Sequence, residues 1–350
     1  MLGTLVSRFF ATDLAVDLGT SNTVVFARGQ GIVLDEPTVV AMRDKAVLAT
    51  GQPAKAMLGR EPGTVQVTRP LKHGVIAEPD LAQAMLDDFL KRTTTAWSRA
   101  RRPRVIITVP SDSTPVERRA VRDLAMHAGA RETYLVSATF ATALGAGLPI
   151  HEAGGHMILT VGGGTSEVAL LSLSGIVQCE SVRAGGDEMD DAIIAWARKH
   201  HNLLIGARQA EAIKLALGSA HPVTRGRSLA VKGRDVIDGL PKTVQMTDDE
   251  IGEALRDSVV AIVEAVRTCL EQTPPELAGD IVETGIVMAG GGALLPGLAD
   301  LVHNETGLPV TVAPEPLSAT ALGAGKLLDS LAVLERVSVD ANPKAATSSR

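Results

Sequence analysis

Aromatic residues are scarce in this chain of 350 residues, because Phe, Trp and Tyr together make up only 2% of it. Apolar residues nevertheless reach 45% of the chain, so its core must be built from Ala, Val, Leu and Ile. This aliphatic composition is typical of α/β proteins and excludes a disordered chain. A chain of this length is expected to form about two domains.

Cysteines, long apolar runs and positive charge are also in short supply. Cys179 and Cys269 are the two cysteines, which is too few for a disulfide framework and fits a reducing cytoplasm. No apolar run approaches the ~20 residues that cross a bilayer. The net charge of -6 and the pI of about 5.8 argue against a nucleic-acid-binding protein, which normally presents a basic face.

Six short apolar runs predict strands, at residues 15–18, 23–27, 105–110, 157–161, 167–173 and 285–289. A helical pattern at 81–92 follows the start signals Pro79 and Asp80. A second helix is announced by Thr114 and Glu117, which are spaced as in a capping box. Its predicted buried face consists of Val116, Ala120, Val121, Leu124 and Ala128.

The order of these elements predicts two related α/β halves with a cleft between them. A strand, a glycine turn and a second strand occur twice, at 14–27 and at 157–173, and the two turns are expected to face each other. We predict a first domain at 1–146, to which 316–335 return, and a second at 147–315. The second contains a small inserted subdomain at about 183–245. A disordered tail is predicted at 336–350.

Three glycine-rich turns are candidate phosphate-binding loops. Glycines let the backbone approach a phosphate and point its N–H groups inward. The first turn is Gly19, Thr20, Ser21 and Asn22, the second is Gly162, Gly163, Gly164 and Thr165, and the third is Gly290, Gly291 and Gly292. A single turn of this kind is more often a plain loop, but three in one chain favour nucleotide binding.

Asp17 is an acidic residue at the end of an apolar strand, just before the first turn. There it can hold a divalent cation that accompanies the phosphates, directly or through water. The alternative is an acidic residue that merely caps the turn.

Several longer segments resemble the bacterial actin family, most closely the MreB and Mbl cell-shape proteins. They include DLGTSNT at 17–23, RPLKHGVIAEPDLAQAML at 69–86, GGHMILTVGGGTSEVALLSL at 154–173 and GIVMAGGGALLPGLADLV at 285–302. The resemblance implies an actin-like (ribonuclease H-like, duplicated) two-domain α/β fold with ATP and Mg2+ in the cleft. It also implies polymerisation into filaments that organise cell-wall synthesis.

The resemblance also assigns further site residues. It places Glu211 and Lys214 near the ribose and adenine, and Gly290 to Ala293 beside the adenosine. Glu211 and Lys214 are three residues apart and therefore share a helix face, although a solvent-exposed ion pair explains this spacing equally well.

Two departures from the family pattern affect the chemistry of hydrolysis. MreB-like proteins usually read IEEPMAAA where this chain has Val136, Ser137, Ala138, Thr139 and Phe140, so both glutamates are missing. The family motif DIGGGT also loses its acid, because Thr160 stands in its place. Loss of a water-orienting acid typically costs ~10² to 10⁴ in rate. We therefore expect ATP binding with slow or lost hydrolysis, and we assign no catalytic residue.

The sequence also suggests contact with a membrane surface. Residues 1–10 can form a short amphipathic helix, and WSRARRPR at 97–104 joins Trp97 to four arginines. Two weak signals together can hold a protein at anionic lipid. The alternatives are a frayed strand extension for the first segment and a solvated loop for the second.

The predicted partners are further copies of the chain or a related actin-like protein, the inner membrane surface and cell-wall synthesis proteins, but no nucleic acid. The predicted location is the cytoplasm, at the inner face of the membrane. An active ATPase or a sugar-kinase-like phosphotransferase is the alternative function. A heat-shock ATPase would need a long peptide-binding domain, and a dehydrogenase would need GxGxxG after its first strand.

Overall fold

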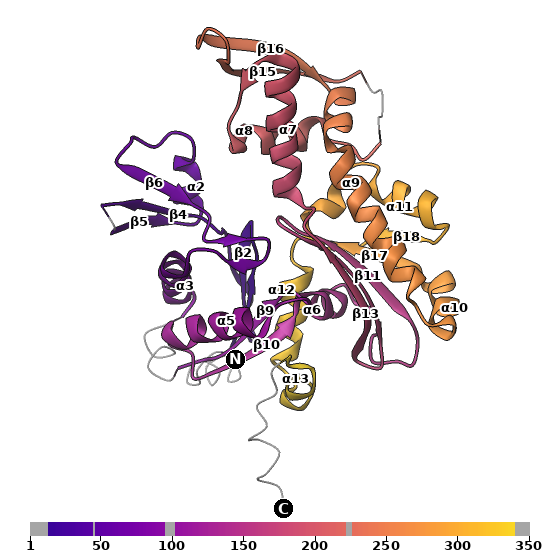
Figure 1. The fold of residues 1–350 in the computed structure, drawn as a ribbon. Helices are drawn as coiled ribbons and strands as arrows, with labels where there is room; N and C mark the ends of the chain where they lie inside the picture. The colour runs from indigo at the N-terminus through magenta and orange to yellow at the C-terminus, as the bar shows by residue number, and fades with distance from the viewer. Residues whose placement is uncertain (1–12, 45, 95–101, 222–225, 340–350) are drawn as a thin grey trace, which may run out of the picture.

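The computed structural model describes residues 13–44, 46–94, 102–221 and 226–339 of the chain. Figure 1 shows two halves, each centred on a β-sheet, with helices packed around them. The predicted amphipathic segment at 1–10, Trp97, Arg99 and Arg101 lie outside the described residues. No helix among the residues that the structure describes has the length and apolar character needed to cross a membrane.

The first half, here called the first lobe, contains a five-stranded sheet of order β10-β9-β1-β2-β3. Its strands are β1 (Leu14–Leu18), β2 (Asn22–Ala27), β3 (Gly31–Pro37), β9 (Arg104–Val109) and β10 (Glu132–Ser137). β1 to β3 are antiparallel neighbours, whereas β9 runs parallel to both β1 and β10. The lobe also contains α3 (Pro79–Thr93), α5 (Pro115–His127) and α6 (Ala138–Gly145).

The second lobe repeats this arrangement with a sheet of order β13-β12-β11-β17-β18. Its strands are β11 (His156–Val161), β12 (Ser166–Ser172), β13 (Gly175–Val182), β17 (Ile286–Ala289) and β18 (Val310–Val312). The long helix α9 (Asp248–Glu271) packs on β12 and β13. The other helices of this lobe are α10 (Pro275–Thr284), α11 (Leu298–Thr306) and the 3-10 turn η2 (Gly291–Leu294). The predicted strand–turn–strand duplication is therefore present in the fold.

Each lobe carries a smaller sheet, and Figure 1 shows both small sheets on the same side of the molecule. The small sheet of the first lobe consists of β4 (Val40–Arg43), β5 (Ala46–Thr50) and β6 (Val65–Thr68). The same lobe contains α2 (Gln52–Met57) and the short strand pair β7 (Leu71–Lys72) and β8 (Val75–Ile76). The small sheet of the second lobe consists of β14 (Leu203–Leu204), β15 (Ser228–Asp235) and β16 (Pro241–Thr247). It lies beside α7 (Gly186–His201) and α8 (Ala207–Leu217). The latter group overlaps the predicted inserted subdomain, whose boundaries stay a prediction.

Buried aliphatic side chains fill both lobes and continue between them. One cluster lies within each lobe, and a third joins residues such as Ala15, Ile106, Ile158 and Ala289 from the two large sheets. α6 and α12 (Ala319–Leu327) pack against each other and contact strands of the first lobe. The aliphatic core predicted from the composition is confirmed.

Two predictions about individual segments are wrong. The capping box of α5 forms, but Val116 and Ala120 point to solvent, and the buried residues are Val121, Leu124 and Ala125. The first turn of α5 thus lies beyond the edge of the core, so its apolar residue stays exposed. The tail also starts later than predicted, because α13 (Leu331–Val337) includes residue 336 and the Val339 amide donates to the Leu135 carbonyl at 2.9 Å.

Candidate functional site

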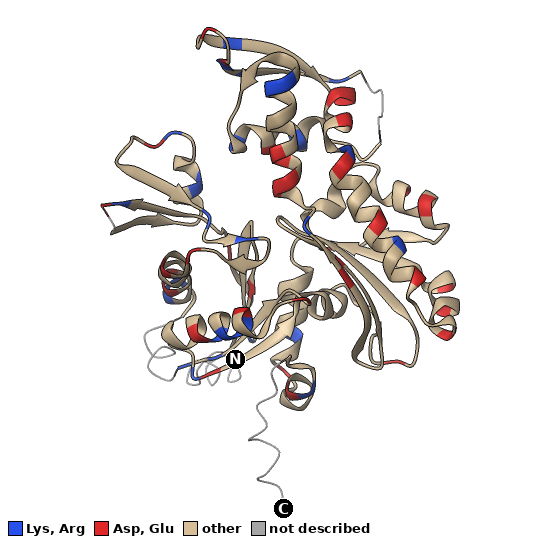
Figure 2. Cartoon of the chain, in the orientation of Figure 1, with Lys and Arg blue, Asp and Glu red and all other residues tan. Residues whose placement is uncertain are grey.

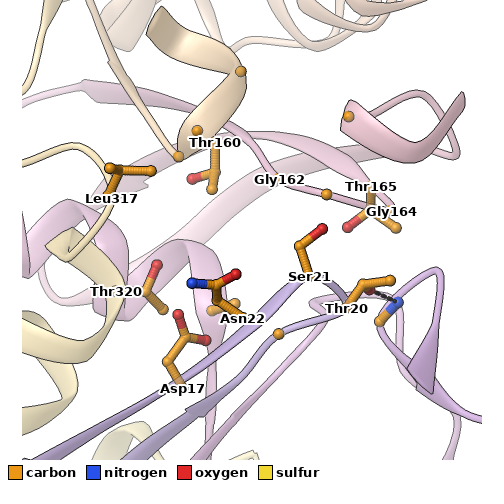
Figure 3. Close-up of a pocket in the computed structure, with 18 of the residues that line it drawn as sticks. Asp17, Thr20, Ser21, Asn22, Thr160, Gly162, Gly164, Thr165, Leu317 and Thr320 are labelled. Atoms are coloured by element: carbon orange, nitrogen blue, oxygen red, sulfur yellow. Dashed lines mark hydrogen bonds between the residues drawn. The ribbon is translucent and has the colours of Figure 1, made fainter. Parts of the chain in front are cut away.

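A cavity with a volume of about 520 Å³ is lined by residues of both lobes. All three glycine turns contribute to its wall, as do Asp17, Glu211 and Lys214. Figure 3 shows Ser21 of the first turn pointing toward the second turn at Gly162 and Gly164. The cavity therefore brings together residues that are more than 250 positions apart in the chain, such as Asp17 and Gly290.

The first glycine turn is the tight connection between β1 and β2. The Gly19 amide donates to the Asn22 carbonyl at 3.1 Å, and the Gly19 carbonyl accepts from Thr38 Oγ1 at 2.7 Å. Thr20 Oγ1 accepts from the Gly74 amide at 2.8 Å, the dashed contact in Figure 3. These bonds fix the turn before any ligand binds.

The second glycine turn connects β11 and β12 in the same way, with the Gly162 amide donating to the Thr165 carbonyl at 2.8 Å. A Cβ added to Gly163 would overlap Ser21 Oγ of the first turn. Only glycine allows this approach, so the expectation that the two turns face each other is confirmed.

The third glycine turn follows β17 and leads into η2. Gly290 has a φ of 83°, a left-handed conformation that favours glycine, and a Cβ on Gly292 would overlap Val161. Gly290, Gly291 and Gly292 all line the cavity. Ala293 does not line it, because its side chain is buried in the core of the second lobe. The expectation that Ala293 borders a ligand is therefore corrected.

Asp17 lies where β1 ends, at the wall of the cavity. Thr108 Oγ1 donates to its Oδ1 at 2.7 Å, and loss of hydration raises the pKa of Asp17 to about 6. A carboxylate held in this way favours a cation, and Mg2+ prefers such oxygen ligands. No group of three or more His, Cys, Asp or Glu side chains gathers as a metal site among the described residues. Asp17 thus fits Mg2+ that is held mainly by phosphates.

Glu211 and Lys214 lie on one face of α8, as their spacing predicted, but they do not pair with each other. Lys214 Nζ lies 2.9 Å from Asp190 Oδ1 and donates to the Gly186 carbonyl at 2.6 Å. Glu211 pairs with Lys55 of the first lobe at 2.9 Å. Lys214 is thus held against α7, while Glu211 bridges the lobes.

The sequence reasoning missed two acidic residues of the cavity wall, Asp35 and Glu167. Asp35 accepts from Asn22 Nδ2 at 2.9 Å. Glu167 is only 4% exposed, and burial raises its pKa to about 7. Glu167 stands in an apolar strand two residues after the second glycine turn. This is the same kind of signal that identified Asp17, so the sequence did contain it.

Two hydroxyl residues, Ser137 and Thr160, and the apolar Ala138 occupy the positions at which the family pattern would place acids. Thr160, Ala138 and Thr139 line the cavity, and Thr160 Oγ1 is buried without a hydrogen-bond partner. Ser137 lies at the end of β10 and its Oγ accepts from the Phe140 amide at 3.4 Å, which caps α6. A nucleotide in this cavity would therefore meet a hydroxyl at Thr160 and a methyl group at Ala138 where acids are usual.

The family model described as MreB/Mbl protein matches residues 11–336, which is nearly the whole chain. The chain belongs to the MreB/Mbl family. It is 48% identical over 328 residues to the cell shape-determining protein MreB of Escherichia coli K12, covering 92% of this chain and 94% of that protein. It is 40% identical over 324 residues to the cell shape-determining protein Mbl of Bacillus subtilis 168, covering 92% and 97% of the two chains.

Two solved structures share the architecture. The crystal structure of MreB 5 of Spiroplasma citri bound to AMPPNP matches with a TM-score of 0.86 and 34% identity, covering 91% of this chain and 96% of that one. The MamK double helical filament matches with a TM-score of 0.76 at 22% identity, over 91% and 99% of the chains. The predicted actin-like α/β fold is therefore confirmed for this MreB/Mbl family member.

Proposed function

We propose that the chain binds ATP with Mg2+ between its lobes and assembles into filaments that organise cell-wall synthesis and cell shape. The observation that carries this proposal is the meeting of three glycine turns from two lobes around one cavity, with Asp17 beside them. The turns supply backbone N–H groups for phosphates. Asp17 would hold the Mg2+, which neutralises phosphate charge when bound.

Relatives support both parts of the proposal. The S. citri structures contain AMPPNP in one case and ADP in the other, and the E. coli and B. subtilis relatives are named as cell shape-determining proteins. The MamK match is to a double helical filament. A nucleotide-dependent filament accounts for all of these similarities.

Slow hydrolysis is part of the proposal. Ser137, Ala138 and Thr160 offer no carboxylate to orient the attacking water, and phosphoryl transfer depends on that positioning. A faster ATPase is the second candidate, and one observation favours it: Glu167 brings a buried carboxylate to the cavity wall. A measured turnover number separates the two candidates.

Calorimetry with ATP and Mg2+ tests the binding step, and pelleting followed by electron microscopy tests assembly. We expect ATP to bind, the Asp17→Asn variant to lose the Mg2+-dependent part of the affinity, and filaments to require nucleotide. A folded chain without affinity for adenine nucleotides would refute the proposal.

Association with the inner membrane face and with cell-wall synthesis proteins is also proposed. The full chain is expected to float with anionic liposomes. Removal of residues 1–10 together with Trp97→Ala should release it, since apolar and basic residues supply the two membrane signals. Equal flotation of both forms would count against membrane binding.

A further inference from the structure

Three hydroxyl side chains and one carboxylate form a compact cluster between the lobes. Ser111 follows β9, Ser137 ends β10, Thr139 begins α6, and Glu167 comes from β12 of the second lobe. Ser111 Oγ lies 2.8 Å from Ser137 Oγ and 2.7 Å from Thr139 Oγ1, which are themselves 2.8 Å apart. Ser111 Oγ also donates to Glu167 Oε2 at 3.1 Å. The four side chains therefore share one hydrogen-bonded network, here called the hydroxyl cluster.

The hydroxyl cluster reaches the nucleotide cavity at two points, because Thr139 and Glu167 line its wall. Glu167 pairs across the sheet with Thr160, so both side chains leave the same face of neighbouring strands. Thr160 Oγ1 is buried and has no hydrogen-bond partner, and Figure 3 shows this side chain among the cavity residues. A bound water needs two to four polar partners. The side chains of Thr139, Thr160 and Glu167 offer such partners.

The hydroxyl cluster can take up one additional proton, because its members make more contacts than they have protons to donate. Four oxygen–oxygen contacts join its members, but three hydroxyls supply only three protons. With Glu167 ionised, Ser111 donates to the carboxylate and one contact of the hydroxyl triangle lacks a proton. With Glu167 protonated, it donates to Ser111, and the three hydroxyls can donate around the triangle. The network is thus complete in the state in which Glu167 has accepted a proton.

We propose that Glu167 is the proton acceptor for the water that attacks the γ-phosphate of ATP, with Thr139 orienting that water. This inference rests on the proposed ATP binding. The water oxygen forms a bond to the γ-phosphorus, and the bond from that phosphorus to the β–γ bridging oxygen breaks. The electron pair of that bond leaves with ADP. The proton of the water passes to the Glu167 carboxylate, directly or by way of Thr139 and Ser111, and later to solvent.

The surroundings of Glu167 suit this role. Burial and the nearby negative charge of Asp112 raise its pKa to about 7, although the hydrogen bonds from Ser111 oppose the shift. Cys179 on the neighbouring strand stays a neutral thiol, because burial raises its pKa to about 12. A carboxylate with a pKa near the working pH is an efficient proton acceptor. Hydrolysis should therefore fall as the pH drops through about 7, where Glu167 becomes protonated.

The Glu167→Gln variant tests the inference in the full-length chain. We expect single-turnover hydrolysis of ATP to fall by about 100-fold, while calorimetry shows an ATP affinity within about threefold of the parent chain. The remaining rate should also lose the fall that the parent chain shows as the pH drops through about 7. The Glu264→Gln variant, on the exposed face of α9, is the matched control and should hydrolyse ATP like the parent chain.

Thr139 offers a second, finer test. Thr139→Val keeps the shape of the side chain but removes the hydroxyl, so it should lower the rate constant of hydrolysis about tenfold with little change in ATP affinity. Thr139→Ser retains a hydroxyl and should preserve most of the rate.

The outcomes separate this inference from the proposed function. A parent chain that does not bind ATP refutes the proposed function. A parent chain that binds ATP but shows no turnover, or a Glu167→Gln variant with unchanged rate and pH profile, overturns the role of Glu167 alone. Loss of folding in Glu167→Gln would show in its circular dichroism spectrum. In that case the hydrolysis rates of Thr139→Val and Thr139→Ser would test the inference: equal rates for these two variants would overturn it.

Discussion

At the scale of single residues, two carboxylates shape the cavity in different ways. Asp17 ends β1 with one hydrogen bond from Thr108, whereas Glu167 accepts from both the amide and the hydroxyl of Ser111. The bonds from Ser111 favour the ionised form of Glu167, yet burial still raises its pKa to about 7, above the value of about 6 for Asp17. Glu167 is therefore the better candidate for a proton acceptor, and Asp17, which has fewer donors on its oxygens, is the better candidate for the proposed metal ligand. Neither carboxylate stands at the start of α6, where the family pattern places an acid and this chain has none.

Ala138 is the position at which that acid can be restored. It is the first residue of α6, it lines the cavity, and the first turn of the helix contains no acidic residue. A glutamate is favoured near a helix N-terminus. We expect Ala138→Glu to raise the hydrolysis rate at least about tenfold, measured as phosphate release, while Ala138→Gln leaves it unchanged. Equal rates for both variants would show that the missing acid does not limit turnover.

Glu167 should also make stability depend on pH. Its pKa is raised from 4.5 to about 7 in the folded chain, so the folded state binds the proton more tightly than the unfolded state. The ionised, buried carboxylate therefore costs free energy, and this cost grows as the pH rises from about 4.5 to about 7. Relative to Glu167→Gln, the nucleotide-free parent chain should lose about 2 kcal/mol of unfolding free energy between about pH 5 and about pH 8.

Denaturant unfolding of the two chains at both pH values measures this difference. Glu264→Gln serves again as the control, because that side chain is exposed on α9. A difference between Glu167→Gln and the parent chain that stays constant with pH would contradict the prediction.

At the scale of elements, α6 and α12 cross with their backbones in close contact. A Cβ on Gly323 would overlap the Ala141 carbonyl, and a Cβ on Gly145 would overlap the Ala319 carbonyl. The two helices touch through their backbones, which only glycine permits. Thr142 Oγ1 and Thr320 Oγ1 add a contact of 2.9 Å beside this crossing. Since α6 starts at the hydroxyl cluster, the crossing holds Thr139 in place.

Gly323→Ala should therefore destabilise the protein strongly. Because the methyl group meets backbone rather than a flexible side chain, we expect a loss on the order of 3 kcal/mol, seen as a lower thermal midpoint. Gly279→Ala is the control, since Gly279 lies in α10 with open space around its Cβ position. That change should stabilise the chain by up to about 1 kcal/mol. Similar midpoints for the two variants would disprove the packing argument.

At the scale of the whole molecule, ion pairs connect the lobes on the side of the small sheets. Lys55 of α2 pairs with Glu211 of α8 at 2.9 Å, and Arg69 pairs with Asp187 at the start of α7. His73 Nδ1 lies 3.1 Å from both the Gly164 carbonyl and Glu188 Oε1. Figure 2 shows that acidic residues outnumber basic ones along α9 and α10, away from these pairs. The pairs favour a closed arrangement around the cavity.

Reversing the Lys55–Glu211 pair tests its part in closure. Lys55→Glu or Glu211→Lys alone should weaken ATP binding, because like charges then face each other between the two lobes. The double swap should recover part of the affinity, with a coupling of about 0.5–1 kcal/mol in calorimetry. The same cycle on Glu253 and Arg256, an ion pair within α9, should show no coupling to ATP affinity. Additive effects at Lys55 and Glu211 would contradict a closing role.

Local patterns in the sequence were sufficient to predict the strands, the glycine turns and Asp17. The side-chain period of a strand and the conformational freedom of glycine act over a few residues, so one chain displays them. The local pattern failed for Val116, and the position taken from the family resemblance failed to bring Ala293 to the cavity wall, because the extent of the core around a helix or turn depends on distant elements. Glu167 carried a visible signal, but its importance emerged only from the residues that surround it.

The sequence by itself determined an aliphatic α/β chain with a duplicated strand–turn–strand unit and three glycine turns. Only the tertiary structure decided which hydroxyls meet Glu167, which cation pairs with Glu211, and how closely α6 approaches α12. These contacts join residues 56 to 182 positions apart, such as Ser111 with Glu167 and Leu144 with Lys326. Hydrogen bonds and packing act over a few ångströms in space, and no spacing along the chain specifies which distant atoms will come that close.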